Sequence, residues 1–189
     1  GVIANTMLEA FDQVTLWRAH FQPRNEVVAL IGHNSPTPIP PSDLDMGEEQ
    51  RWAVRGARAT DLGRVILPAN EKTIIFFYAG NLSGSRERFR QYPLNTDDRP
   101  VIEFGAPRSL RKTDKGEWPH FVGRKFTTLV DELLAATPPV DDPALQARSP
   151  ANRRLPLAGA AFHWAWVAFV EQKPEALQQH WDEFIGHWE

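Results

Sequence analysis

Three side chains near the carboxyl terminus have a spacing that could hold a metal ion. His180, Glu183 and His187 occupy positions i, i+3 and i+7, which places them on one face of a helix. Two imidazoles and a carboxylate form a ligand set that zinc accepts. The same face could simply be solvated, because Trp181 and Ile185 point to another side of the helix. The pattern favours the solvated face, and we predict no metal site.

An acidic stretch in the middle of the chain is the second candidate for chemistry. Asp97 and Asp98, which precede Arg99, could lie beside a cationic amine. A structural role is the alternative, because Asn95 and Asp97 are turn formers. Asp98 and Arg99 could also fix the loop through hydrogen bonds. The composition of the stretch favours the structural role.

Other catalytic signatures do not occur in the sequence. The chain has no cysteine, which excludes disulfides, thiolate metal sites and a cysteine nucleophile. Ser35, Ser83 and Ser85 lie outside any Gly-x-Ser-x-Gly motif, the turn that exposes the nucleophile of many hydrolases. His163 lies within an apolar stretch, and we predict a core histidine bonded to a backbone carbonyl.

Composition indicates an ordinary globular chain. The 189 residues fit one large domain or two small ones, with 42% hydrophobic and 24% charged residues. A net charge of −3 argues against nucleic-acid binding. No run reaches the roughly 18 apolar residues that a membrane helix needs, so we predict no direct membrane insertion.

The first half of the chain predicts one helix and a β-hairpin, followed by less regular structure. Residues 2–12 have helical apolar spacing, and residues 14–32 form two strands, 14–21 and 27–31, around a turn at Pro23. The second strand is continuously apolar, so we expect it to be buried on both faces. The remaining predictions are a proline-rich loop and five shorter elements: helices over 42–55, 60–68, 70–79 (where a strand is the alternative) and 86–91, and a strand over 101–104.

The second half predicts helices. Val122, Phe126 and Leu129 begin an apolar stripe that continues to Leu134, residues 155–171 are apolar nearly all round, and Pro174 suits the start of a last helix. The predicted fold class is therefore α+β and mostly helical, with an antiparallel β-hairpin, packed helices and a C-terminal helical hairpin. The predicted blocks are 1–107, a linker at 108–118 and a helical appendage at 119–189. The basic linker would be solvated or would touch anionic lipid head groups.

Two segments carry a resemblance to a known family. Residues 2–31 contain Thr6 and Phe11 before Val14-Thr15-Leu16-Trp17-Arg18, and residues 94–104 read Leu-Asn-Thr-Asp-Asp-Arg-Pro-Val-Ile-Glu-Phe before Ala106-Pro107-Arg108. In this order they resemble the C-terminal part of a spermidine synthase-like protein. The similarity is to bacterial members in which an aminopropyltransferase-like domain follows a membrane-embedded half.

The resemblance implies where the chemistry of the parent protein would lie. Family members bind decarboxylated S-adenosylmethionine on a Rossmann-like sheet and transfer its aminopropyl group to a diamine. Their Gly-rich turn and acidic residues precede the helix that opens this chain, so none is matched here. Gly80 and Gly84 also lack the strand–turn–helix context of a nucleotide turn. We therefore expect a fragment that is inactive alone, without catalytic residues or cofactor, and that depends on the missing N-terminal half of its parent.

The hairpin is implied to be a remnant of the edge of that sheet, with its tip near the amine pocket. Phe21 and Gln22 at the tip, together with Asp97 and Asp98, are then the substrate-proximal candidates. The tip departs from the family's aromatic, Gly-containing pattern where Arg24 and Asn25 stand in place of Ser-Gly.

The sequence also leads to expectations about location, assembly and an alternative function. The chain would be the cytoplasmic, soluble part of a membrane-anchored parent. An open strand edge predicts a homo-oligomer through the 14–32 hairpin. The alternative function is a non-catalytic helical interaction module on a degenerate synthase scaffold, with the tryptophan-rich tail as its binding face.

Overall fold

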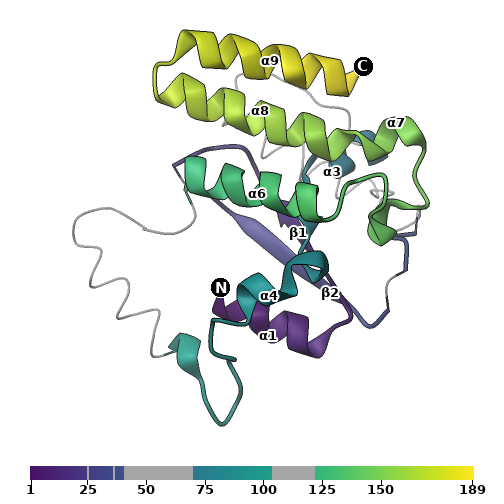
Figure 1. Ribbon diagram of the computed structural model, residues 1–189, viewed down its shortest axis with the longest axis vertical. Helices are drawn as coiled ribbons and strands as arrows, with labels where there is room; N and C mark the ends of the chain where they lie inside the picture. The colour runs from purple at the N-terminus through teal and green to yellow at the C-terminus, as the bar shows by residue number, and fades with distance from the viewer. Residues whose placement is uncertain (25, 36, 41–69, 104–121) are drawn as a thin grey trace.

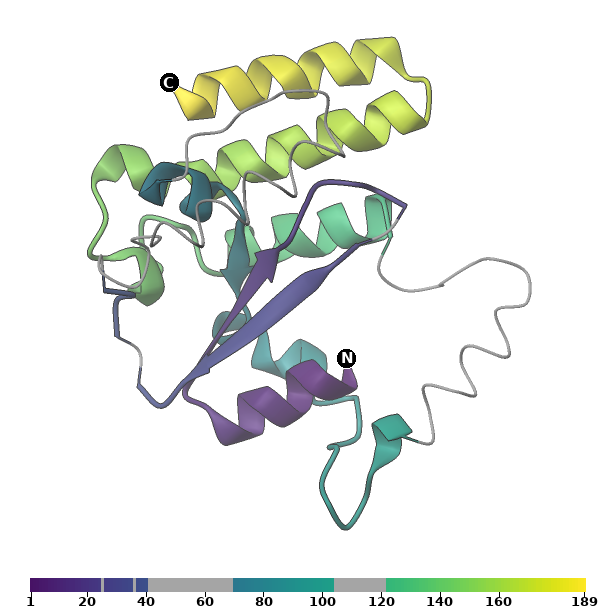
Figure 2. The ribbon, with the colours of Figure 1, turned by 180° about the vertical axis from the view of Figure 1, so that it is seen from behind.

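The computed structural model describes residues 1–24, 26–35, 37–40, 70–103 and 122–189, which form a mostly helical α+β structure (Figures 1 and 2). The first elements are a helix and three strands with a short helix between them: α1 (Val2–Ala10), β1 (Gln13–Arg18), β2 (Val28–His33), α3 (Glu71–Phe76) and β3 (Tyr78–Asn81). Helical elements follow: η2 (Ser83–Ser85), α4 (Arg86–Phe89), α6 (Arg124–Ala136), η3 (Pro143–Leu145), α7 (Pro150–Arg153), α8 (Leu155–Val170) and α9 (Pro174–Trp188).

The three strands form one antiparallel sheet in the order β2–β1–β3. β1 pairs with β2 without interruption, from Gln13 opposite His33 to Arg18 opposite Val28. Its pairing with β3 has an irregularity between Leu16 and Trp17. β1 is therefore the central strand.

One face of the sheet packs against α1, α4 and α6. These helices present apolar side chains at helical spacing, which bury their inner stripes against the strands. The resulting core cluster includes Leu8, Val14, Leu16, Ala79, Phe89, Phe126, Leu133 and Leu134. It draws on residues from both predicted blocks, 1–107 and 119–189, so the two blocks share a core.

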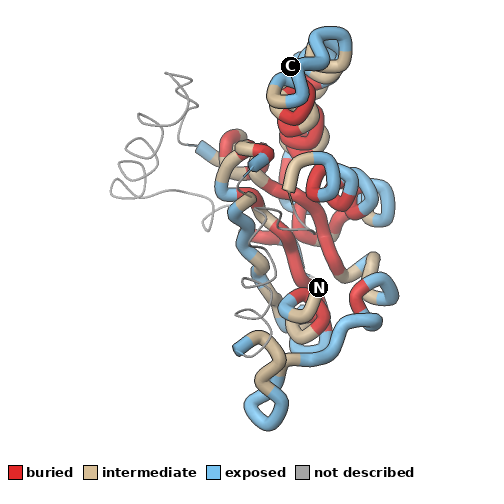
Figure 3. Tube along the Cα trace, turned by 90° about the vertical axis from the view of Figure 1, so that its left-hand side faces the viewer, coloured by how far each residue is buried: buried red, intermediate tan, exposed pale blue. Residues whose placement is uncertain are grey.

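The opposite face and one end of the sheet form two further core clusters. Trp17 and Tyr78 pack there against Ile39, Leu145 and Leu155. At the end of the sheet, Phe21 and Phe76 pack against α8 and α9 in a cluster that includes Ala158, Ala161 and Phe184. Figure 3 shows the buried residues gathered through the strands and α8, with exposed residues along α9.

Several sequence predictions are confirmed. The hairpin forms, and the stripe of α6 is buried from Phe126 to Leu134. α8 is the apolar central helix, and Pro174 occupies the first turn of α9, where its missing N–H costs nothing. The two last helices pack as a hairpin (Figure 1).

Other predictions need correction. β2 is not buried on both faces, because it is an edge strand with exposed Val28 and Ile31. The first strand ends at Arg18, before Phe21. Residues 70–79 divide into α3 and the start of β3, since Asn70 caps the helix while Tyr78 pairs with Trp17. Residues 101–103 are helical instead of a strand.

Helical spacing also predicts an apolar stripe on the last helix, from Leu177 to Trp188, which is only partly buried, and three other predictions fall outside the described residues. On α9, Phe184 is buried, but Trp181 and Ile185 are exposed because only one side of this helix packs on α8. The predicted helices at 42–55 and 60–68 and the linker at 108–118 lie outside the described residues. No helix in the described ranges has the length and apolar character needed to cross a membrane.

Candidate functional site

The hairpin tip residues are held against the helices. Phe21 is 3% exposed, and its ring centroid lies 4.8 Å from that of Phe76, 5.1 Å from Phe162 and 5.7 Å from His163. Gln22 is half-buried, and its backbone N–H donates to Nδ1 of His20 at 3.2 Å. The aromatic side chain of the tip is therefore a core residue in this structure.

Asp97 and Asp98 lie in an exposed tight turn. The backbone N–H of Arg99 donates to the carbonyl of Thr96 at 2.9 Å, and Oδ1 of Asn95 accepts from the N–H of Ile102 at 2.8 Å. Figure 2 shows this teal segment beyond α1, away from the chain that joins β1 to β2. The structure therefore does not bring the two aspartates together with Phe21 and Gln22.

A buried charged cluster lies next to Phe21 and consists of Arg18, Glu26 and His163. Arg18 comes from the end of β1, Glu26 from the return into β2, and His163 from the middle of α8. All three side chains are almost inaccessible to solvent. Nε2 of His163 lies 3.0 Å from Oε1 of Glu26. The predicted backbone-carbonyl partner of His163 is thus replaced by a carboxylate.

The cluster is incompletely hydrogen-bonded. Nη1 of Arg18 donates to the carbonyl of Phe76 at 3.4 Å. Among the described residues, Nε and Nη2 of Arg18 and Nδ1 of His163 have no hydrogen-bond partner, and the close approach of His163 to Glu26 is not aligned as a hydrogen bond. Unpaired buried polar groups cost free energy, so this is a high-energy part of the core.

Burial dominates the electrostatics of the cluster. It lowers the pKa of Arg18 to about 9, against the opposing attraction of Glu26 and Asp131. It also lowers the pKa of His163, although contact with Glu26 acts in the other direction. Arg18 therefore remains cationic at neutral pH, and His163 is neutral.

The cluster offers acid–base groups but no access for a substrate. His163 is fully buried, and the Arg18 guanidinium lies against the backbone of α8 at Gly159, where a Cβ would come within 2.5 Å of Nη1. Its chemistry is therefore confined to holding the hairpin end to α8. Sequence reasoning missed Arg18 and Glu26, and the only local signal was a histidine inside an apolar helix.

Stability should fall as the pH drops below about 6.5, the ordinary pKa of a histidine in an unfolded chain. Burial keeps His163 neutral in the folded state, while the unfolded chain takes up a proton in that range. Proton uptake by the unfolded chain then favours unfolding. The contribution of His163 to the free energy of unfolding is therefore fully present above pH 6.5 and is lost progressively as the pH falls toward the lower pKa of the folded state. Urea unfolding of wild type and His163→Gln at several pH values measures it, and the variant should have the flatter pH dependence.

The comparison variant for this measurement is His187→Gln, at a half-buried position in the last turn of α9. It tests whether removal of any histidine has the same consequence. An equal flattening in both variants would contradict a specific role for His163.

A second buried polar cluster is fully hydrogen-bonded. The hydroxyl of Tyr78 donates to Oδ2 of Asp142 at 2.5 Å, and Nδ2 of Asn81 donates to Oδ1 of the same carboxylate at 3.1 Å. The backbone N–H of Ala144 donates to Oδ1 at 3.0 Å. Burial raises the pKa of both Tyr78 and Asp142. Through these three hydrogen bonds the buried Asp142 joins η3 to β3.

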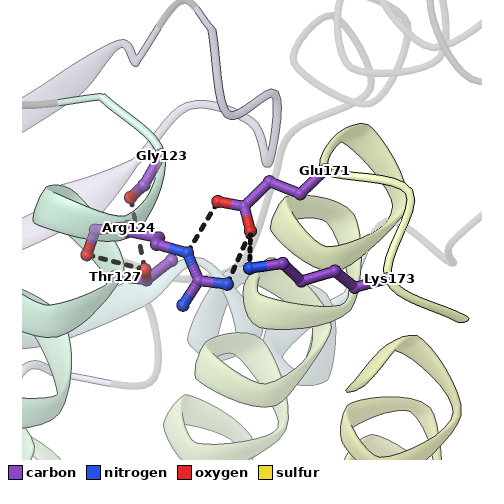
Figure 4. Close-up of polar contacts among 5 residues, drawn as sticks. All are labelled: Gly123, Arg124, Thr127, Glu171 and Lys173. Atoms are coloured by element: carbon purple, nitrogen blue, oxygen red, sulfur yellow. Dashed lines mark hydrogen bonds and ion pairs between the residues drawn. The ribbon is translucent and has the colours of Figure 1, made fainter. Parts of the chain in front are cut away.

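A surface cluster links α6 to the end of α8 (Figure 4). Nε and Nη2 of Arg124 donate to the two carboxylate oxygens of Glu171 at 2.6 and 2.5 Å, and Nζ of Lys173 lies 3.0 Å from one of them. Hydrogen bonds from Arg124 hold the pKa of Glu171 at about 2. This bidentate pair adds a specific surface contact between the two helices.

A cavity of about 360 Å³ lies between α4 and α6. Its floor is apolar, formed by Phe89 and Leu129, and its rim is basic, with Arg88, Arg124 and Lys125. Arg88 pairs with Glu132, and Arg124 pairs with Glu171, so carboxylates already neutralise part of this rim. The cavity therefore gives no chemical indication of a ligand.

The predicted helical face of His180, Glu183 and His187 forms without a cluster of three ligands. Nδ1 of His180 lies 2.9 Å from Oε2 of Glu183, and the imidazole stacks on Trp164 with centroids 5.6 Å apart. No group of three or more metal-ligating side chains occurs within the ranges that the structure describes.

Comparison with known proteins identified no matching family model, no matching curated protein and no matching solved structure.

Proposed function

We propose that this chain is the C-terminal part of a spermidine synthase-like protein. In the parent, the reaction would transfer the aminopropyl group of decarboxylated S-adenosylmethionine to a diamine. The nucleotide-binding residues would belong to the parent's preceding part, so the chain alone would be inactive. This proposal includes the hairpin as the closing edge of a Rossmann-like sheet.

The observation that supports it is contact between the two segments that carry the resemblance. Oγ1 of Thr6, in α1, accepts from the backbone N–H of Asn95 at 2.8 Å. Nδ2 of Asn5 donates to the carbonyl of Tyr92, two residues before the second segment begins, at 2.6 Å. Segments far apart in the sequence are thus joined by hydrogen bonds, as expected if they belong to one unit of the parent fold.

Within the proposal, the tip and the acidic turn have different roles. Phe21 and Gln22 remain the substrate-proximal candidates because they follow the end of β1, and since Phe21 is buried, the half-buried Gln22 is the one whose side chain would reach a substrate. Asp97 and Asp98 lie in an exposed turn next to Asn95, which is bonded to Thr6 of α1. Phe21 instead packs against Phe76, and these different neighbours favour a structural role for the turn.

The test is an aminopropyltransfer assay on the longer parent protein and on the 189-residue chain. Decarboxylated S-adenosylmethionine and putrescine are supplied, and spermidine and methylthioadenosine are measured. We expect both products from the parent and neither from the chain. Absence of cofactor binding by the parent, or turnover by the chain alone, would overturn the proposal.

A helical interaction module is the second candidate, favoured by one feature of the last two helices. Phe169 on α8 is 60% exposed, and Trp181 and Ile185 on α9 are 43% and 37% exposed. Large apolar side chains on a surface are enriched at binding sites. Under this alternative, the parent would neither bind the nucleotide nor produce spermidine, and substitution of Trp181 would affect only its association with partners.

A further inference from the structure

The outer edge of β2 has backbone groups that pair with no strand among the described residues. The N–H of Ala19 donates to the carbonyl of Val27 at 2.9 Å, and the Thr15 hydroxyl reaches the carbonyl of Ile31 at 3.4 Å. The backbone N–H and carbonyl groups that face β1 are therefore those of Val27, Ala29, Ile31 and His33. By the alternation of an antiparallel ladder, those of residues 28, 30 and 32 face outward. No described strand pairs with them.

The strand β2 itself also lacks the residues and irregularities by which many exposed strands are protected. Natural edges usually carry a charge, a proline or a bulge that prevents pairing with another chain. Residues 27–32 read Val-Val-Ala-Leu-Ile-Gly, without charge or proline, and their pairing with β1 is regular. Val27, Val28 and Ile31 are 47%, 44% and 43% exposed. An edge of this kind is suited to strand addition.

We propose that two copies of this chain pair antiparallel through β2, about a two-fold axis at Leu30. Leu30 would then face Leu30 of the second copy, and Val28 would face Gly32. In this register every outward N–H and carbonyl of residues 28, 30 and 32 meets a partner group. The two three-stranded sheets become one continuous sheet.

The side chains suit this register because no like charges oppose each other. On one face, Ala29 lies opposite Ile31 of the second copy, so a small residue meets a large one. On the other face, Val28 meets Gly32, which is already covered by the ring of Phe11. A second copy is thus a self-complementary partner, whereas a charged partner strand would find no complement on this edge.

Sedimentation velocity of the 189-residue chain over a wide concentration range tests the pairing. We expect a monomer–dimer equilibrium that moves toward dimer as concentration rises. Val28→Pro removes an outward N–H and leaves the β1 ladder intact, and symmetry makes the loss occur twice. Dimerisation should weaken about tenfold or more. Val28→Ala keeps the N–H and should retain most of the dimer.

A second pair of variants keeps the test valid if Val28→Pro fails to fold. Ile31→Lys places a charge beside the two-fold axis and should give a monomer. Val140→Lys changes another exposed apolar residue, close to Asp142 and therefore on the β3 side of the sheet, at the opposite edge from β2, and it should leave the dimer unchanged. Circular dichroism confirms that each variant is folded.

Three results would overturn the pairing. They are a wild-type chain that stays monomeric at near-millimolar concentration, a dimer that persists in both Val28→Pro and Ile31→Lys, and equal loss in Val140→Lys. The inference does not rest on aminopropyl transfer. If the parent proves inactive, the proposed dimer of the chain is unaffected. If the chain proves monomeric, the proposed activity of the parent is unaffected.

Discussion

Asp142→Ala should be among the most destabilising single substitutions in this protein, lowering the free energy of unfolding by about 3–5 kcal/mol. The carboxylate accepts hydrogen bonds from the side chains of Tyr78 and Asn81 and from the N–H of Ala144. Alanine would leave these buried donors without an acceptor, and each unsatisfied buried group costs about 1–3 kcal/mol. Urea unfolding followed by tryptophan fluorescence measures the loss.

Asp141→Ala is the matched control for this prediction. Asp141 is the exposed neighbour, and its backbone hydrogen bond to Pro138 is kept when the side chain is removed. Its substitution should change stability by less than about 0.5 kcal/mol. If the two variants unfold at the same urea concentration, the buried cluster around Asp142 does not have the importance assigned to it.

Gly159→Ala should destabilise the protein by about 1–3 kcal/mol, although alanine is the better helix former. A Cβ at this position would lie 2.2 Å from the carbonyl oxygen of Phe76 and 2.5 Å from Nη1 of Arg18. The first contact is with backbone, which cannot move away without displacing α3 from α8. Differential scanning calorimetry should therefore show a lower melting temperature.

Gly186→Ala, which is also a substitution within a helix, should have the opposite effect on stability. Gly186 lies in α9, and a Cβ there would meet nothing within 4 Å. Alanine should stabilise by about 0.5–1 kcal/mol through helix propensity and a less flexible unfolded chain. A melting temperature that changes in the same direction for both variants would contradict the close packing inferred at Gly159.

The helices and the first strand pair could be predicted from local sequence because their signals are local. The stripe of α6, the apolar length of α8 and the proline at the start of α9 each act within a few residues. The boundary between α3 and β3 could not be predicted in this way. Residues 73–78 suit a strand, but Asn70 caps a helix, and pairing of Tyr78 with distant Trp17 fixes where the strand begins.

The buried charged cluster was beyond sequence reasoning for a similar reason. Arg18 follows an alternating strand pattern, Glu26 precedes an apolar run, and His163 lies in a helix far along the chain. Only the packing of the hairpin end against α8 brings them together. The predicted grouping of Phe21 with Asp97 came from a resemblance, and the structure gives these residues different neighbours.

The irregularity in β3 makes the length of that strand as important as its composition. Tyr78 and Asn81 are three residues apart, so in a regular strand their side chains would point to opposite faces. Between them Ala79 is the extra residue opposite β1, and Gly80 has a φ of 129°, which favours glycine. Removing or adding one residue here would turn one donor away from Asp142, so insertions and deletions should be tolerated far less than substitutions.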